Sequence, residues 1–173
     1  MIACLDVHYK DAHARAAGVV LESWTQHTPS ATYFTDLTDV HPYEPGSFFR
    51  RALPCLLAVL RLLPALPRVL IVDGYVWVSP EREPGLGAHL HEALSLKSIV
   101  VGVAKTEFIA LTHSRPVQLV YRGSSRAPLF VTSIGFGPQE AGTLVRSMYG
   151  NHRIPDALRV VDRLARSNLP ISQ

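Results

Sequence analysis

The sequence predicts one α/β domain, a mixed β-sheet flanked by helices, that spans residues 1–173. The chain of 173 residues is long enough for one well-packed domain and short for two. Hydrophobic residues make up 47% of it and charged residues 18%, which indicates a substantial core. Strand-like segments come first, and strand-like and helical segments alternate after them, an order typical of α/β domains.

The N-terminal third is typical of an antiparallel meander. Residues 1–7, 14–21 and 31–37 are apolar runs separated by turn-forming or polar residues, and each predicts a strand. The connections are short enough for neighbouring strands to pair antiparallel.

A helix is predicted after Pro45-Gly46, because apolar residues recur at three- and four-residue steps from Phe48 to Leu63. Pro54 lies inside this stretch, so it either kinks the helix or marks where the helix begins.

The remainder predicts alternating elements around a buried sheet. Residues 68–74 form a β-branched run that ends on Asp73-Gly74, which is typical of a central parallel strand. A helix over 85–96 and a strand over 98–103 then suggest a right-handed crossover. Further strands are expected at 117–121 and 129–132, and helices at 138–149 and 155–167, the last with Pro155 in its first turn.

Composition and motifs exclude several classes of function. Cys4 and Cys55 form no CxxC pair and lie in apolar runs, so we expect buried thiols in a reducing compartment. Charged residues and prolines interrupt the longest apolar run, so we expect no membrane span and a cytoplasmic protein. The histidines other than His89 show no zinc-ligand spacing with an acid, and no phosphate-binding glycine loop is present. The net charge of +3 is compatible with nucleic-acid binding without requiring it, and the oligomeric state is left open.

Two acids follow predicted strands at positions where chemistry gathers in α/β sheets. Asp6 ends the first predicted strand and Asp73 ends a central one. If these strands are neighbours, both carboxylates point into one site at the carboxyl ends of the strands. Paired carboxylates are ligands for Mg²⁺ or Mn²⁺. The alternative is that each aspartate merely caps a strand end or turn.

A series of short segments occurs in a fixed order along almost the whole chain. They are Asp6-Val7-His8-Tyr9, Pro42-Tyr43-Glu44-Pro45-Gly46, Arg51-Ala52-Leu53-Pro54, Val72-Asp73-Gly74, Gly85-Leu86-Gly87-Ala88-His89-Leu90, Gly102-Val103-Ala104-Lys105, Tyr149-Gly150-Asn151-His152-Arg153-Ile154-Pro155 and Asp162-Arg163-Leu164-Ala165-Arg166. Together they resemble the endonuclease V family, whose segments are Asp-Val-x-Tyr, Pro-Tyr-x-Pro-Gly, Arg-Glu-x-Pro, Val-Asp-Gly, Gly-Leu-Ala-Ser-His-Leu, Gly-Val-Ala-Lys, Tyr-Arg-Leu-Pro and Ala-Asp-Arg-Leu-Ala.

The resemblance implies an RNase H-like fold and metal-dependent cleavage of DNA or RNA near a deaminated base, typically inosine. It assigns Asp6 and Asp73 as ligands of Mg²⁺ (or Mn²⁺), and Lys105 to the catalytic set, where a lysine neutralises phosphate charge. Without the resemblance, Lys105 would be taken for a solvated lysine after a strand.

The resemblance also implies a substrate-binding set. Tyr43 falls in the family's wedge segment, which opens the strand beside the lesion, and Pro42, Pro45 and Gly46 belong to the same segment. The alternative for Tyr43 is a turn aromatic packed between the two prolines. His89 matches a family histidine and is grouped with this set, although we expect it to support a helix or loop rather than act as a catalyst.

Three departures from the family pattern indicate a degenerate active site. Ala52 occupies the position of the metal-binding glutamate of Arg-Glu-x-Pro, Ser79 the position of a histidine, and Phe136 the position of a second histidine that we expect near the site. Glu44, Glu81 or Glu83 could replace the lost carboxylate. The sequence therefore favours an endonuclease V-like protein with weak activity and a weakened or absent cation site. The alternative is a catalytically inactive homologue that binds nucleic acid or acts as a scaffold.

Overall fold

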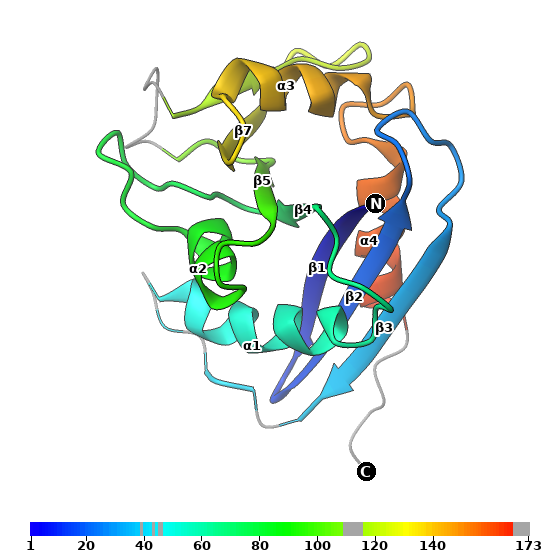
Figure 1. The fold of residues 1–173 in the computed structure, drawn as a ribbon, viewed down its shortest axis with the longest axis vertical. Helices are drawn as coiled ribbons and strands as arrows, with labels where there is room; N and C mark the ends of the chain where they lie inside the picture. The colour runs from blue at the N-terminus through cyan, green and yellow to red at the C-terminus, as the bar shows by residue number, and fades with distance from the viewer. Residues whose placement is uncertain (39, 43, 45–46, 109–115, 168–173) are drawn as a thin grey trace.

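One mixed β-sheet organises the described part of the chain (Figure 1). The computed structural model describes residues 1–38, 40–42, 44, 47–108 and 116–167. Within them, seven strands follow the order β3-β2-β1-β4-β5-β7-β6. Four helices accompany the sheet, which confirms the predicted mixed sheet flanked by helices.

The predicted antiparallel meander is confirmed. It consists of β1 (Ile2–Lys10), β2 (His13–Leu21) and β3 (Ala31–Leu37). β1 is longer than predicted, because its pairing with β2 continues to Lys10 opposite His13. The prediction that this strand spans residues 1–7 was therefore too short, because the hairpin extends the strand by three residues to Lys10.

The centre of the sheet is parallel, as the β-branched run predicted. β4 (Val69–Asp73) pairs parallel with β1 on one side and with β5 (Ile99–Ala104) on the other. α2 (Leu86–Ala93) connects β4 to β5. The parallel pairing of β1 with β4 extends only to Leu5 opposite Val72, so the two strands part at Asp6 and Asp73.

The C-terminal third completes the sheet with two antiparallel strands and covers it with two helices. β7 (Leu129–Ile134) pairs with β5, and β6 (Gln118–Val120) pairs with β7 at the edge. α3 (Pro138–Ser147) and α4 (Asp156–Arg166) follow. Pro155 is the N-cap residue of α4 rather than a first-turn residue.

Each face of the sheet buries its own hydrophobic core. Side chains alternate along a strand, so Cys4 and Ile71 face α3 and α4, whereas Leu5 and Val72 face α1 (Phe48–Leu60) and α2. Figure 1 shows these two helix pairs on opposite sides of the sheet. Both cysteines are buried and free, and burial raises the pKa of Cys55 to about 11 and that of Cys4 to about 12. The predicted burial of both thiols is confirmed.

α1 runs through Pro54 without a break. The helix begins at Phe48, six residues before the proline, so the alternative that Pro54 marks its start was wrong. Pro54 cannot donate a backbone hydrogen bond, but the apolar side of the helix, including Ala52, Leu56 and Val59, packs against the sheet and holds the helix in place. None of the helices in the described residues is long and apolar enough to cross a membrane.

A glycine in β5 lets the loop after β4 lie directly over the sheet. A Cβ at Gly102 would come within 2.6 Å of Gly74 O and 2.8 Å of Val76 N. The Val76 N–H instead donates to Thr132 Oγ1 over 2.8 Å. Gly74 itself has φ +136°, a conformation that favours glycine. These contacts fix the direction in which the chain leaves Asp73.

Candidate active site

The structure brings Asp6, Asp73 and Lys105 together where the central strands end. Asp6 follows Leu5, the last residue of β1 that pairs with β4, and Asp73 is the last residue of β4. Lys105 follows β5, the next strand. Alternation along the strands points all three side chains to the α4 face, where they line one small gap with Leu158 and Val161 of α4.

Lys105 forms an ion pair with one carboxylate of the site. Its Nζ lies 2.5 Å from Asp73 Oδ2, and both side chains are about one-third exposed. The backbone at Lys105 is also held, because the Arg153 guanidinium donates to Lys105 O and to Pro128 O. The lysine predicted from the sequence is thus a positioned cation next to the acids rather than a lysine surrounded only by solvent.

Asp6 is a carboxyl group with little compensation for its burial. Burial raises its pKa, and the negative charge of Asp73 raises it further, to about 6. The Val7 N–H donates to Asp6 Oδ1 over 2.8 Å, and Lys105 lies nearby, but neither offsets these effects. Burial alone would lower the pKa of Lys105, but its bond to Asp73 and the charges of Asp73, Asp6 and Asp162 raise it. The lysine therefore remains protonated.

Asp162 on α4 is a further acid of this cluster that the sequence reasoning did not single out. Its charge acts on both Asp6 and Lys105. Arg166, one turn later on the same helix, donates from Nε to the two oxygens of Asp162 over 3.0 and 3.1 Å. The signal was present in the sequence, because Asp162 begins one of the segments that carry the family resemblance.

The paired carboxylates of Asp6 and Asp73 have the chemistry of a divalent-cation site. The described residues contain no cluster of three or more acidic, histidine or cysteine side chains placed to hold a metal ion. Mg²⁺, however, commonly takes only one or two carboxylates and completes its shell with water and phosphate oxygens. Burial and the charge of Asp73 raise the pKa of Asp6, and Lys105, which is paired with Asp73, offsets this only in part, so a cation fits here.

None of the glutamates considered as replacements joins the pair. Glu44 lies 4.0 Å from Arg50 on the surface, and Glu83 lines a separate pocket. Glu81 is exposed in the loop between β4 and α2.

Ala52, which the sequence aligned with the family's glutamate, lies at the edge of the acid pair. It is 1% exposed, lies on α1 and lines a narrow gap together with Asp6 and Asp73. The gap has a volume of about 20 Å³, roughly the room for one water molecule. Residue 52 therefore borders the acid pair directly.

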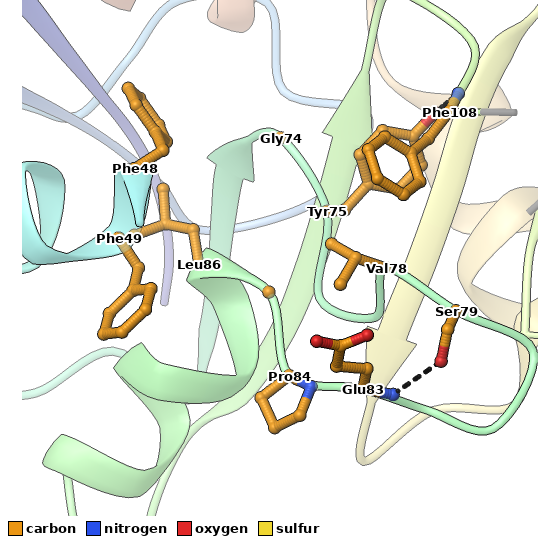
Figure 2. A pocket seen from close by; sticks show the side chains of 11 residues that line it. Phe48, Phe49, Gly74, Tyr75, Val78, Ser79, Glu83, Pro84, Leu86 and Phe108 are labelled. Carbon is orange, nitrogen blue, oxygen red and sulfur yellow. Dashed lines mark hydrogen bonds between the residues drawn. The ribbon is translucent and has the colours of Figure 1, made fainter. Parts of the chain in front are cut away.

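An apolar pocket of about 580 Å³ opens beside the acids. Figure 2 shows Phe48, Phe49 and Leu86 along one side of it, with Tyr75 and Phe108 on the opposite side. Gly74 and Tyr75, which directly follow Asp73, are part of the lining. The volume and the aromatic walls suit a flat, largely apolar group such as a nucleobase.

The predicted binding residues are only partly placed by the structure. Tyr43, Pro45 and Gly46 lie outside the described residues, and Pro42 is exposed. His89 stacks on Phe49 with ring centroids 3.7 Å apart and an interplanar angle of 18°. It therefore packs α2 against α1, and it reaches the pocket only through Phe49.

Ser79 and Phe136, which the sequence aligned with histidines of the family, lie at different distances from the acids. Ser79 lines the apolar pocket, where its Oγ accepts a hydrogen bond from Glu83 N (Figure 2). Phe136 packs against Trp24 beyond Ile134, which pairs with Val100 near the start of β5. Lys105 lies past the other end of that strand, about 15 Å away at the rise of a β-strand. The expectation that Phe136 occupies an active-site position was wrong, because β7 runs antiparallel to β5 and carries it away.

Comparison with known proteins identifies relatives of this chain. A family model for endonuclease V matches residues 1–163. Endonuclease V of Azotobacter vinelandii is 31% identical over 185 residues, covering 95% of this chain and 81% of the relative. Endonuclease V of Streptomyces coelicolor is 36% identical over 149 residues, covering 84% of this chain but 58% of the relative.

Solved structures agree with the fold. Endonuclease V from Streptomyces avermitilis superposes with a TM-score of 0.76 at 26% identity, covering 95% of this chain and 79% of that one. Endonuclease V from Ciona intestinalis, in complex with a 23-mer DNA containing an inosine followed by a ribo-adenosine, gives 0.80 at 19% identity, with coverages of 95% and 83%. These structures have an RNase H-like fold, so the predicted fold class is confirmed.

The uncompensated burial of Asp6 predicts how stability depends on pH. Its folded-state pKa of about 6 exceeds the ordinary value of 3.8, so the folded protein binds this proton more tightly than the unfolded chain. The free energy of unfolding should therefore fall as pH rises from about 4 to about 6. Asp6→Asn removes the charge and keeps an acceptor for Val7 N–H. Without divalent cations, we expect urea unfolding to show the variant more stable by about 1–3 kcal/mol at pH 8, and by less at pH 4.

Glu92→Gln, which removes an exposed carboxylate from α2, is the matched control and should leave stability unchanged. An Asp6→Asn variant no more stable than the wild-type protein at pH 8 would contradict this account of the site.

Proposed function

This chain belongs to the endonuclease V family, and from that premise we propose that it is a nuclease for DNA or RNA strands containing a deaminated base such as inosine. The observation that carries the proposal is the cluster of Asp6, Asp73 and Lys105 beside an apolar, aromatic pocket. The Ciona relative bound to inosine-containing DNA supports the substrate class. We further propose that residues 1–173 act as one domain, in the cytoplasm.

The pocket would hold the deaminated base after it leaves the stack. Phe48, Tyr75 and Phe108 offer aromatic surface to a base, and stacking of this kind is sequence-tolerant. Tyr75 is fixed in place because its hydroxyl donates to Thr106 O and accepts from Phe108 N–H. The segment of Pro42, Tyr43, Pro45 and Gly46 lies just before α1 in the chain and would supply the wedge.

The carboxylates of Asp6 and Asp73 would hold a Mg²⁺ or Mn²⁺ ion. Such an ion supplies Lewis-acid stabilisation of the charge that develops on the reacting phosphate. Asp6 must be ionised to serve as a ligand, and its raised pKa means that protons compete with the cation below about pH 6. Acidic Asp162 lies close enough to add negative charge at the site.

Lys105 would bind a phosphate oxygen of the substrate. In the protein alone it neutralises Asp73, and a cation at the carboxylates would weaken that ion pair and leave the ammonium group available. Arg153 holds the backbone of Lys105, so its reach is limited to the region beside the acids.

The alanine at position 52, where the family pattern has a glutamate, favours a second candidate function without cleavage. Ala52 leaves the site one carboxylate short of the family pattern, and no other described acid fills the gap. A weaker cation site predicts slow cleavage. Complete loss of cleavage would leave a homologue that binds nucleic acid or acts as a scaffold.

Cleavage of an inosine-containing strand tests the nuclease directly. With Mg²⁺ or Mn²⁺, we expect the wild-type protein to cut a labelled strand slowly and Asp73→Asn to lower the rate by about a hundredfold or more. Glu92→Gln should cut at the wild-type rate. Binding of the strand without cleavage by the wild-type protein would contradict the nuclease proposal and support the second candidate.

Restoring the missing carboxylate tests whether Ala52 limits activity. We expect Ala52→Glu to raise the cleavage rate or to lower the Mg²⁺ concentration needed for half-maximal activity, by about tenfold. Ala52→Gln has the same shape without the charge, so it controls for packing in the narrow gap. If the glutamate and glutamine variants behave alike, the site is not limited by a third carboxylate.

A further inference from the structure

We propose that the exposed basic side of α4, together with Lys105, binds the backbone phosphates of the nucleic-acid strand beyond the acid pair. We call this surface the α4 groove; its lining residues are Lys105, Ile154, Leu158, Arg159, Asp162, Arg163 and Arg166. The proposal rests on the proposed function, because it assigns a second contact to the strand whose deaminated base enters the apolar pocket.

The α4 groove is strongly cationic. It has a volume of about 380 Å³, and four of its lining side chains are basic whereas only Asp162 is acidic. Ile154 and Leu158 provide an apolar floor between the charges. A concave surface with this charge is complementary to a polyanionic backbone, which accounts for much of the affinity between proteins and nucleic acids.

The arginines lie on the side of α4 that packing does not use. Leu158, Val161 and Ala165 are buried against the sheet. Arg159, Arg163 and Arg166 are exposed and follow one another at four- and three-residue steps, so they form a stripe on one side of the helix. Their placement therefore serves neither the core nor the contact between α4 and β1.

Arg163 is the basic residue of the α4 groove whose guanidinium group is not engaged by a carboxylate among the described residues. Arg159 lies 3.5 Å from Asp156, Arg166 is bound to Asp162, and Lys105 is paired with Asp73. Arg163 has no carboxylate partner within the described part of the chain. A guanidinium group without a partner presents five donors and binds phosphate oxygens in pairs.

The acid pair lies between the α4 groove and the apolar pocket: Lys105 and Leu158 of the groove line one small gap with Asp6 and Asp73. Lys105 lines the groove, and Phe108, three residues later, lines the pocket. Asp73 binds Lys105 on one side and is followed by Gly74 and Tyr75 of the pocket on the other. The Tyr75 hydroxyl donates to Thr106 O and accepts from Phe108 N–H, so the segment after Lys105 is hydrogen-bonded to the loop after Asp73. A strand with its base in the pocket passes the acids and continues along α4.

The dependence of binding on salt tests this path. The probe is a fluorescently labelled single strand with one inosine, titrated with protein in Ca²⁺ instead of Mg²⁺ over a series of salt concentrations. Each phosphate contact contributes about 0.7 to the slope of log affinity against log salt for a single strand. We expect Arg163→Gln to reduce the slope by about that amount, so that its deficit in affinity shrinks about fivefold over a tenfold rise in salt.

Arg61→Gln is the matched control. Arg61 is also an exposed arginine with no carboxylate partner among the described residues, but it lies at the far end of α1 from the pocket-lining Phe48. It should leave both affinity and slope unchanged. A wild-type slope for Arg163→Gln, or an equal loss in Arg61→Gln, would overturn the α4 groove.

The outcome separates this proposal from the proposed function. If the wild-type protein binds strands with and without inosine equally, the base pocket fails, whereas the slope still reports on Arg163. If inosine is preferred but the slope of Arg163→Gln is unchanged, only the groove fails. Absence of any strand binding by the wild-type protein would contradict both.

Discussion

Parallel pairing between β1 and β4 brings the carboxyl groups of Asp6 and Asp73 together on one face of the sheet, partly out of water. Burial and the neighbouring like charge destabilise ionised Asp6 in the folded chain, and both raise its pKa. Lys105 neutralises only one of the two carboxylates. The structure therefore retains an electrostatic cost that a bound cation would relieve, which is typical of sites kept for function rather than for stability.

The two cavities near the acid pair lie on opposite faces of the sheet. The acids and Lys105 point toward α4, whose outer surface is basic, whereas the aromatic pocket lies beside α1 and α2. The loop that leaves Asp73 joins the two sides, and it can lie close to β5 only because residue 102 is glycine. The proposed contacts to cation, base and backbone thus share a small set of strand ends and loops.

Local patterns in the sequence predicted the strands and their acids well, because apolar runs and turn residues are local signals. They failed where long-range pairing decides the outcome. The extension of β1 depends on its hairpin with β2, and the distance of Phe136 from the acids depends on the antiparallel direction of β7. The roles of Asp162 and Arg163 depend on the rotation of α4 against the sheet, and the pocket forms only when α1, α2 and the loop after β4 meet.

We propose that Asp6 and Asp73 form a divalent-cation site despite the alanine at position 52. A crystal of the protein soaked in Mn²⁺, with anomalous scattering recorded at the manganese edge, tests it most directly. We expect an anomalous peak at coordination distance from one oxygen of each aspartate, with Lys105 Nζ displaced from Asp73 Oδ2. An empty map between the two carboxylates at saturating Mn²⁺, with the Lys105–Asp73 ion pair intact, would contradict it.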